Sequence, residues 1–325
     1  MRFILRTAIL VFAFVCHLPF QSALAADYSV GSADITLHDS SRNRDVPVKI
    51  YYPKTSEHHR FPIIVFSHGA GGSKNGYAFL GQYWAAHGYV VLNPTHYGSD
   101  TSLLKKRRLF YILRAVKKMV EDKTNLVNRP KDISFLLDSL PQMEEWVPAL
   151  KGRMDPTRIG VGGHSFGAYT SMAVAGAKVY GALDPPAQFG DTRVTAFLAL
   201  SPQGPGKWAF KDDSWDTIHR PVFIMTGTQD KGIGNDESYQ WRVKAYEHLR
   251  PGHKYLAVIK GANHMDFYDT QLNGRVRDPR VHKWIKQASL MFWDAYVKGN
   301  RGLQEKLKQE GFPKMPGVKV QVETK

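Results

Sequence analysis

One serine in this chain is placed for nucleophilic chemistry. The stretch GHSFG, residues 163–167, follows a short apolar run and precedes an alanine-rich segment with helical spacing. A serine hydroxyl is a weak nucleophile until a base removes its proton, and it must project from the backbone to meet a substrate. A tight turn from strand to helix exposes it, and the two glycines leave room for that turn. The spacing predicts Ser165 as a nucleophile, because a serine that only caps a helix would need neither glycine.

A nucleophilic serine needs a base and an acid that orients the base. In folds that carry such a turn, these partners follow in the order serine, acid, histidine. Asp230 and His264 have this order, and each comes just after an apolar run that predicts a strand. The carboxyl ends of parallel strands meet at one edge of a sheet, where sites gather. We expect His264 to be the base and Asp230 the acid, with Asp236 and Asp266 as weaker alternatives for the acid.

Acyl transfer also needs N–H donors for the charge that develops on the carbonyl oxygen. The backbone N–H of Phe166, directly after the serine, is predicted as one donor because it opens the following helix. The loop 67–72 reads SHGAGG and follows another apolar run. Its glycines let the backbone approach a ligand closely. We therefore expect the N–H of Ala70 to be the second donor.

Alternating apolar runs and helical patterns predict the elements that hold these residues. The expected strands are 46–52, 62–67, 89–92, 158–162, 194–200, 221–226 and 255–259. The expected helices are 76–87, 131–140 with Pro130 at its start, 166–178, 237–249 and 281–297. The alternation predicts an α/β fold with a mostly parallel sheet and helices on both of its faces.

Residues 101–128 break this alternation. From Leu109 onward apolar residues recur at helical spacing, while Arg114 and Lys118 fall on the other side. The pattern predicts an inserted amphipathic helix whose basic face is solvated. Two alternatives stay open: a lid over the site, and a contact with an anionic or membrane surface through the basic residues from Lys105 to Lys118.

The start of the chain has the pattern of a secretory signal peptide. Residues 1–25 combine a basic beginning, an apolar run and small residues near a cleavage point, and a membrane anchor is the less favoured alternative. We expect the protein to be exported, either to a periplasm or to the medium. The rest is predicted as one domain over 26–311 with a polar C-terminal extension over 312–325.

Composition narrows the function classes. The chain has 325 residues and a formal net charge of +15, so its surface should attract anions. No zinc-ligand spacing, RNA-recognition signature or helix-turn-helix pattern accompanies this charge, and a nucleic-acid partner is not expected. Cys16, the only cysteine, lies in the predicted signal peptide. The mature chain is therefore expected to have no disulfide and no thiol nucleophile.

Several segments resemble the α/β-hydrolase superfamily. They include VFSHGAGGSKNGY, RIGVGGHSFGAYT, PVFIMTGTQD and KYLAVIKGANHMDF, and the resemblance spans residues 46–297. Within it, the chain is similar to bacterial proteins labelled predicted dienelactone hydrolases, which are related to platelet-activating-factor acetylhydrolases and cutinase-like polyesterases. The resemblance implies the α/β-hydrolase fold and no cofactor. It also implies the following site residues: a triad of Ser165, Asp230 and His264, and an oxyanion hole of Ala70 and Phe166.

True dienelactone hydrolases use a cysteine where this chain has serine, so we expect a serine esterase. It would cleave small-molecule carboxylic esters through an acyl-serine intermediate. The alternatives are a phospholipid-directed acetylhydrolase or lysophospholipase, a small serine peptidase, and a non-catalytic binding protein on the same scaffold. Trp208 and Trp215, in the loop after strand 194–200, are the better candidates among the aromatic residues for lining a substrate pocket, with a core or surface position as the alternative for each.

Overall fold

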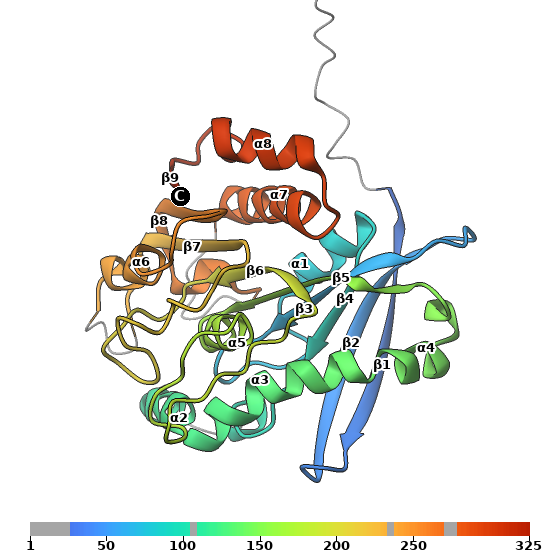
Figure 1. Cartoon of the computed structure of the whole chain (residues 1–325), viewed down its shortest axis with the longest axis horizontal. Coiled ribbons are helices and arrows are strands. Elements are labelled where there is room, and N and C mark those ends of the chain that lie inside the picture. The colour runs from blue at the N-terminus through green and yellow to red at the C-terminus, as the bar shows by residue number, and fades with distance from the viewer. Residues whose placement is uncertain (1–26, 105–108, 233–236, 270–277) are drawn as a thin grey trace, which may run out of the picture.

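The computed structural model describes residues 27–104, 109–232, 237–269 and 278–325. Within them, nine strands form one mixed sheet in the order β1-β2-β4-β3-β5-β6-β7-β8-β9 (Figure 1). The strands are β1 (Ser29–Asp39), β2 (Arg44–Lys54), β3 (Phe61–Ser67), β4 (Val90–Pro94), β5 (Met154–His164), β6 (Val194–Leu200), β7 (Val222–Gln229), β8 (Lys254–Asn263) and β9 (Val320–Thr324). Neighbouring strands from β4 to β8 run parallel, while β1, β2 and β9 pair antiparallel. The predicted mostly parallel sheet is confirmed.

Helices cover both faces of this sheet (Figure 1). They are α1 (Ala78–Ala86), α2 (Leu109–Glu121), α3 (Lys123–Asp138), α4 (Leu140–Trp146), α5 (Phe166–Val174), α6 (Tyr239–Glu247), α7 (Pro279–Tyr296) and α8 (Arg301–Glu310). β3 is buried over its whole length because its side chains alternate between two cores. Ile63 and Val65 belong to the core that α3 and α5 cover, whereas Ile64 and Phe66 belong to the core under α1 and α7.

The start of α3 differs from the prediction. Asp122 caps the helix by accepting a hydrogen bond from the Thr124 N–H at 2.8 Å, so Pro130 lies inside the helix and not at its start. A proline inside a helix removes the hydrogen bond to the carbonyl four residues earlier. Here the Tyr169 hydroxyl donates to that carbonyl, on Leu126, at 2.8 Å. A tertiary contact thus satisfies the group that the proline leaves open.

The C-terminal segment also needs a correction. Residues 312–325 were predicted as a surface extension, and strand 255–259 as the last strand. The segment instead contains β9, which pairs antiparallel with β8 along the edge of the sheet. Val320 and Val322 pack partly buried against the core, and polar residues alternate with them. This alternation is the signal of a half-buried edge strand.

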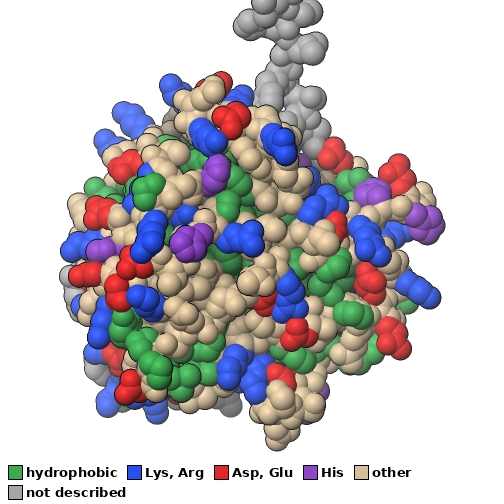
Figure 2. Space-filling model, viewed as in Figure 1, with side chains coloured by type: hydrophobic (Ala, Val, Ile, Leu, Met, Phe, Trp, Pro, Cys, Tyr) green, Lys and Arg blue, Asp and Glu red, His purple; other side chains and the backbone are tan. Residues whose placement is uncertain are grey.

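The predicted inserted helix is confirmed as α2, which follows the 3₁₀ turn η2 (Thr101–Leu104). The helix keeps large apolar side chains at the surface: Tyr111 is 53% exposed and Leu113 is 50% exposed. At the lower left of Figure 2, where Figure 1 places α2, apolar and basic side chains lie next to each other. Part of the predicted basic run, residues 105–108, lies outside the described residues. Of the helices in the described part of the chain, none has the length and apolar character needed to cross a membrane.

Candidate active site

Ser165 occupies a sharp turn between β5 and α5. Its backbone has φ 55° and ψ −116°, a conformation that costs free energy for any residue with a side chain. Two hydrogen bonds hold this conformation: the Ser165 N–H donates to the Leu200 carbonyl at 2.9 Å, and the Gln203 side chain donates to the Ser165 carbonyl at 3.0 Å. The residue is only partly buried, so the turn presents it at the carboxyl edge of the sheet.

The glycines around Ser165 are required by close backbone contacts. A Cβ on Gly163 would overlap the carbonyl of Gly167, and a Cβ on Gly167 would overlap the carbonyl oxygen of Ser67. The turn is therefore packed against itself and against the end of β3. Steric crowding explains the G-x-S-x-G spacing in this chain.

His264 and Asp230 meet at the same edge. Asp230 follows β7 and is fully buried, whereas His264 opens the 3₁₀ turn η4 (His264–Phe267) after β8 and keeps 27% of its side chain exposed. Nδ1 of His264 lies 2.8 Å from Oδ1 of Asp230 and 3.3 Å from Nη2 of Arg242. Because the carboxylate is nearer and only accepts hydrogen bonds, Nδ1 carries the proton. Nε2 is then the basic nitrogen of the ring.

Asp230 is held ionised by its surroundings. Its Oδ1 lies 2.9 Å from Nε of Arg242, and its Oδ2 accepts hydrogen bonds from the hydroxyls of Thr226 and Ser201. Burial alone would raise the pKa of this carboxyl, but Arg242, His264 and Ser201 hold the pKa well below its usual range. Ser201 directly follows β6, so its position in the sequence could have placed it at this edge of the sheet. The position of Arg242, within α6, gives no such indication.

His164 connects the serine turn to the neighbouring elements. Its ring centroid lies 4.7 Å from that of His264, and its Nδ1 shares a hydrogen bond of 2.8 Å with the Tyr77 hydroxyl. That hydroxyl in turn accepts the Gly69 N–H at 3.3 Å. Burial lowers the pKa of His164 well below its usual range, so this ring is neutral. The sequence analysis assigned no role to His164.

The loop that contains Ala70 passes beside Ser165. A Cβ on Gly69 would lie 3.5 Å from the Cβ of Ser165. The loop is fixed by hydrogen bonds from the Gly71 N–H to the Ser99 carbonyl at 2.8 Å and from the Gly72 N–H to the Gly69 carbonyl at 3.0 Å. Phe166 is the first residue of α5, so its N–H lies at a helix N-terminus. The assignment of Ala70 and Phe166 as oxyanion donors stays a prediction that this placement supports.

Other residues singled out by the sequence have different positions. Asp236 lies outside the described residues. Asp266 accepts a hydrogen bond from a backbone N–H and so caps the turn that begins at His264. Trp215 is fully buried in the core, which is the alternative that the sequence analysis left open for it, while Trp208 is half-buried. Among the side chains that the structure describes, no group of three or more His, Cys, Asp or Glu residues is arranged to hold a metal ion.

Known proteins of similar sequence are acetylhydrolases. The family described as "Platelet-activating factor acetylhydrolase, isoform II" matches residues 54–273. A platelet-activating factor acetylhydrolase of Cavia porcellus is 26% identical over 78% of this chain, and one of Bos taurus is 26% identical over 65%. The chain spans 61% and 48% of the lengths of these two relatives.

A solved structure of similar shape is an esterase. The ferulic acid esterase of Streptomyces cinnamoneus superposes with a TM-score of 0.60 at 20% identity. The superposition covers 86% of this chain and 93% of that one. Together with the sheet order, this likeness confirms the predicted α/β-hydrolase fold.

Proposed function

The chain belongs to the platelet-activating factor acetylhydrolase, isoform II, family, and from this premise we propose that it is a serine esterase whose nucleophile is Ser165. The observation that carries the proposal is the 2.8 Å contact between His264 Nδ1 and the buried Asp230 carboxylate, at the edge where the Ser165 turn lies. A buried, ionised acid that orients a partly exposed imidazole is the arrangement that activates a serine hydroxyl.

The first half-reaction forms an acyl-serine. Oγ of Ser165 attacks the carbonyl carbon of the ester, and Nε2 of His264 takes the hydroxyl proton. Asp230 stabilises the imidazolium that results, because its carboxylate faces the positively charged ring. The N–H groups of Ala70 and Phe166 stabilise the negative oxygen of the tetrahedral intermediate. The intermediate collapses when His264 returns its proton to the departing alcohol.

The second half-reaction releases the acid. Water attacks the acyl-serine while His264 takes a proton from it, and the new tetrahedral intermediate collapses to the carboxylic acid and free Ser165. The same donors stabilise both intermediates. All groups in this cycle belong to the protein or the substrate.

The test is hydrolysis of p-nitrophenyl esters from acetyl to palmitoyl. We expect wild type to show an optimum of chain length and Ser165→Ala to lose at least about 10⁴-fold in kcat. Ser102→Ala is the matched control, since this serine is exposed on the neighbouring turn η2 and should leave kcat unchanged. A Ser165→Ala protein that hydrolyses these esters at the wild-type rate would overturn the proposal.

A phospholipid ester is the second candidate substrate. The named relatives are platelet-activating factor acetylhydrolases, and α2 exposes Leu113 beside the exposed cations Arg114 and Lys118. A surface of apolar and basic side chains is suited to an anionic lipid interface, where each cation contributes about 1 kcal/mol.

The double variant Arg114→Glu/Lys118→Glu separates this candidate from a simple soluble-ester hydrolase. We expect its apparent KM for a short-chain phospholipid in anionic micelles to rise by about tenfold or more, while p-nitrophenyl acetate hydrolysis is unchanged. Lys151→Glu, an exposed charge before β5, is the control. Equal KM values for the double variant and wild type would exclude the interfacial role of α2.

We also propose that the protein is exported. The predicted signal peptide over 1–25 lies outside the described residues, so the proposal rests on its sequence pattern. The N-terminal sequence of protein recovered from the periplasm or the medium should begin near Ala26. Leu10→Arg, which places a charge in the apolar run, should keep the chain inside the cell. Recovery of an uncleaved chain that begins at Met1 would contradict the prediction.

A further inference from the structure

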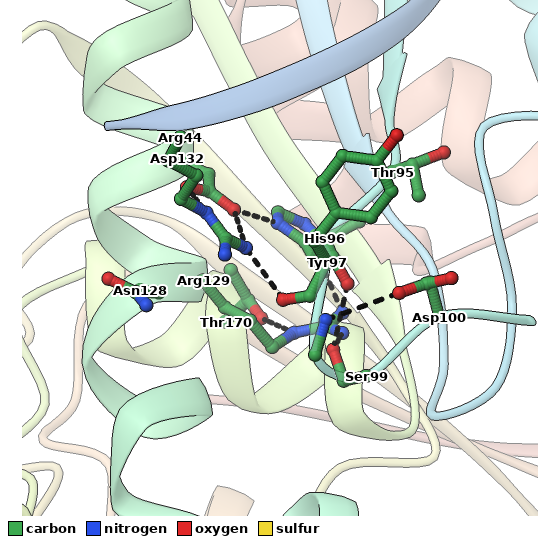
Figure 3. Close-up of polar contacts among 12 residues, drawn as sticks. Arg44, Thr95, His96, Tyr97, Ser99, Asp100, Asn128, Arg129, Asp132 and Thr170 are labelled. Atoms are coloured by element: carbon green, nitrogen blue, oxygen red, sulfur yellow. Dashed lines mark hydrogen bonds and ion pairs between the residues drawn. The ribbon is translucent and has the colours of Figure 1, made fainter. Parts of the chain in front are cut away.

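Arg129, in α3, is a fully buried arginine that joins three segments around the Ser165 turn (Figure 3). All of its hydrogen bonds go to oxygens of other elements. Its acceptors are Thr170 Oγ1 at 2.9 Å, Ser99 Oγ at 2.7 Å, Ser67 Oγ at 3.0 Å and the carbonyl oxygen of His68. They lie on α5, on the loop after β4 and at the end of β3.

In the described part of the chain no carboxylate lies at ion-pair distance from the Arg129 guanidinium, although the nearby Asp132 attracts its charge. Its four acceptors are neutral oxygens. The carboxylate of Asp132 is bound instead by Arg42 and Arg44, at 2.8 Å and 2.9 Å, and by the ring of His96. Burial lowers the pKa of Arg129 to about 9, so the side chain is still a cation at neutral pH. Burying a charge that has no direct ion-pair partner opposes folding. The stability of the fold therefore does not explain why an arginine occupies position 129.

Two of the three segments that Arg129 joins carry the predicted oxyanion donors. His68, whose carbonyl it binds, lies two residues before Ala70 in the loop after β3. The guanidinium carbon also lies 4.5 Å from the ring centre of Phe166, at the start of α5. One planar group therefore contacts the chain next to Ala70 and the side chain of Phe166 at the same time.

The ring of His68 extends this support to the peptide of Ala70. Its Nε2 accepts the His96 N–H at 3.0 Å, so Nδ1 carries the ring proton and donates to the Gly69 carbonyl at 2.7 Å. That carbonyl belongs to the same peptide unit as the Ala70 N–H. Burial and then the neighbouring Arg129 lower the pKa of His68 well below its usual range, which keeps the ring in this neutral form.

Building on the proposed function, we propose that Arg129 is a positioning residue of the oxyanion hole. Its guanidinium fixes the loop that carries Ala70 against the first turn of α5, so that the two N–H groups converge on one point. Its positive charge, which no carboxylate contacts directly, stabilises the anionic tetrahedral intermediate more than the neutral ester. Binding that is stronger in the transition state than in the ground state raises kcat and leaves KM nearly unchanged.

The test compares Arg129→Met, Arg129→Lys and Thr170→Val in the full mature chain. Methionine removes the charge and the planar fork, and lysine keeps the charge. Valine at position 170 keeps Arg129 but removes one of its hydrogen bonds, together with the bond from the Thr170 hydroxyl to the Phe166 carbonyl. The readouts are kcat and KM for a p-nitrophenyl ester, and the inhibition constant of an alkyl boronic acid, which forms a tetrahedral anion on the serine. Thermal unfolding establishes that each variant is folded at the assay temperature.

We expect kcat of Arg129→Met to fall about 10²-fold with KM within about threefold of wild type, and boronic acid affinity to fall by a similar factor. Arg129→Lys should lie between this variant and wild type, and Thr170→Val should lie close to wild type. If Arg129→Met does not fold, the same pattern of lowered kcat and boronic acid affinity in Arg129→Lys decides the question.

Three results would overturn the inference: a folded Arg129→Met with wild-type kcat, a loss confined to KM, or an Arg129→Lys indistinguishable from wild type when the methionine variant is unfolded. A Ser165→Ala protein that stays active would instead overturn the proposed function itself.

Discussion

The molecule contains two sets of serine, histidine and aspartate side chains: a partly exposed set proposed as the active site, here the outer triad, and a fully buried set, here the inner triad. The first consists of Ser165, His264 and Asp230, and the second of Ser67, His96 and Asp132. In the second, Ser67 Oγ lies 2.9 Å from Nε2 of His96, whose Nδ1 lies 2.9 Å from Asp132. Each aspartate is fully buried and paired with arginine. The contact between histidine and buried aspartate is therefore common to both sets and does not distinguish them.

Access and backbone geometry do distinguish them. Ser67 and His96 are both 0% exposed, and Ser67 ends the regular strand β3. Ser165 is partly exposed and sits on a strained turn. Burial lowers the pKa of His96 to about 4, so this ring is neutral throughout the physiological range. The outer triad therefore offers an accessible serine, whereas the inner triad has neither an accessible serine nor a histidine that is readily protonated.

The largest expected difference between the two triads appears when the aspartate of each is neutralised in turn. Asp230→Asn should lower kcat about 10⁴-fold, because the amide favours the wrong tautomer of His264. Asp132→Asn should leave kcat within about tenfold of wild type. It should instead lower the free energy of unfolding by about 3–5 kcal/mol, since Arg42 and Arg44 lose a buried ionic partner. Ester kinetics and denaturant titrations measure the two effects, and equal kcat losses in both variants would refute the division of roles.

The stability of the protein should depend on pH through the protonation of His96 in the inner triad. The pKa of His96 is about 4 in the folded protein, below its unfolded value of about 6.5, because burial and then Arg129 disfavour the charged ring. The unfolded state therefore binds a proton first, and stability is fully present above about pH 6.5 and is lost as the pH falls toward 4. The loss attributable to His96 should be about 3 kcal/mol.

Denaturant unfolding at pH 7, 5.5 and 4 tests this sign. His96→Gln should be less stable at pH 7 but should lose less stability between pH 7 and 4 than wild type does. Below pH 4 a further loss follows, because ion pairs and hydrogen bonds from His96 and Arg44 outweigh burial and hold the pKa of Asp132 at about 2. Identical pH slopes for wild type and His96→Gln would contradict the account of the buried ring.

A smaller effect on stability and kcat should follow from a substitution at Gly167, where the Ser165 turn contacts the backbone of Ser67. A Cβ at position 167 would overlap the carbonyl oxygen of Ser67, so Gly167→Ala should cost about 1–3 kcal/mol of stability and reduce kcat. Gly302→Ala in α8 is the matched control. Its Cβ would lie 3.4 Å from the nearest atom, Asn300 Oδ1, and it should be neutral or stabilising by up to about 1 kcal/mol. Thermal unfolding that ranks the two variants equally would contradict the packing argument.

Much of this arrangement could be predicted from the sequence, because local patterns determine it. Buried strands appear as continuous apolar runs, and residues just after them gather at one sheet edge. That is why the positions of Asp230 and His264 could be anticipated. The G-x-S-x-G spacing records a steric need that is local to the Ser165 turn.

The supporting residues could not be predicted, because their partners are distant in the chain. Arg129 binds groups that lie 30 to 62 residues away, and nothing in the surrounding helix distinguishes it from a surface arginine. Arg242 is likewise a charged residue in the middle of α6. Pro130 was misread as a helix start because Tyr169, which satisfies the carbonyl left open by Pro130, is far along the chain. β9 was missed because an edge strand is short and half polar.

The most direct test of the central claim is to map where a fluorophosphonate probe attaches. The folded mature protein would be labelled, digested and analysed by mass spectrometry, with the inner serine as an internal control. We predict one labelled site, Ser165, with no label on Ser67, and no labelling of Ser165→Ala. Labelling of Ser67, or equal labelling of wild type and Ser165→Ala, would contradict the proposal that the outer triad is the active site.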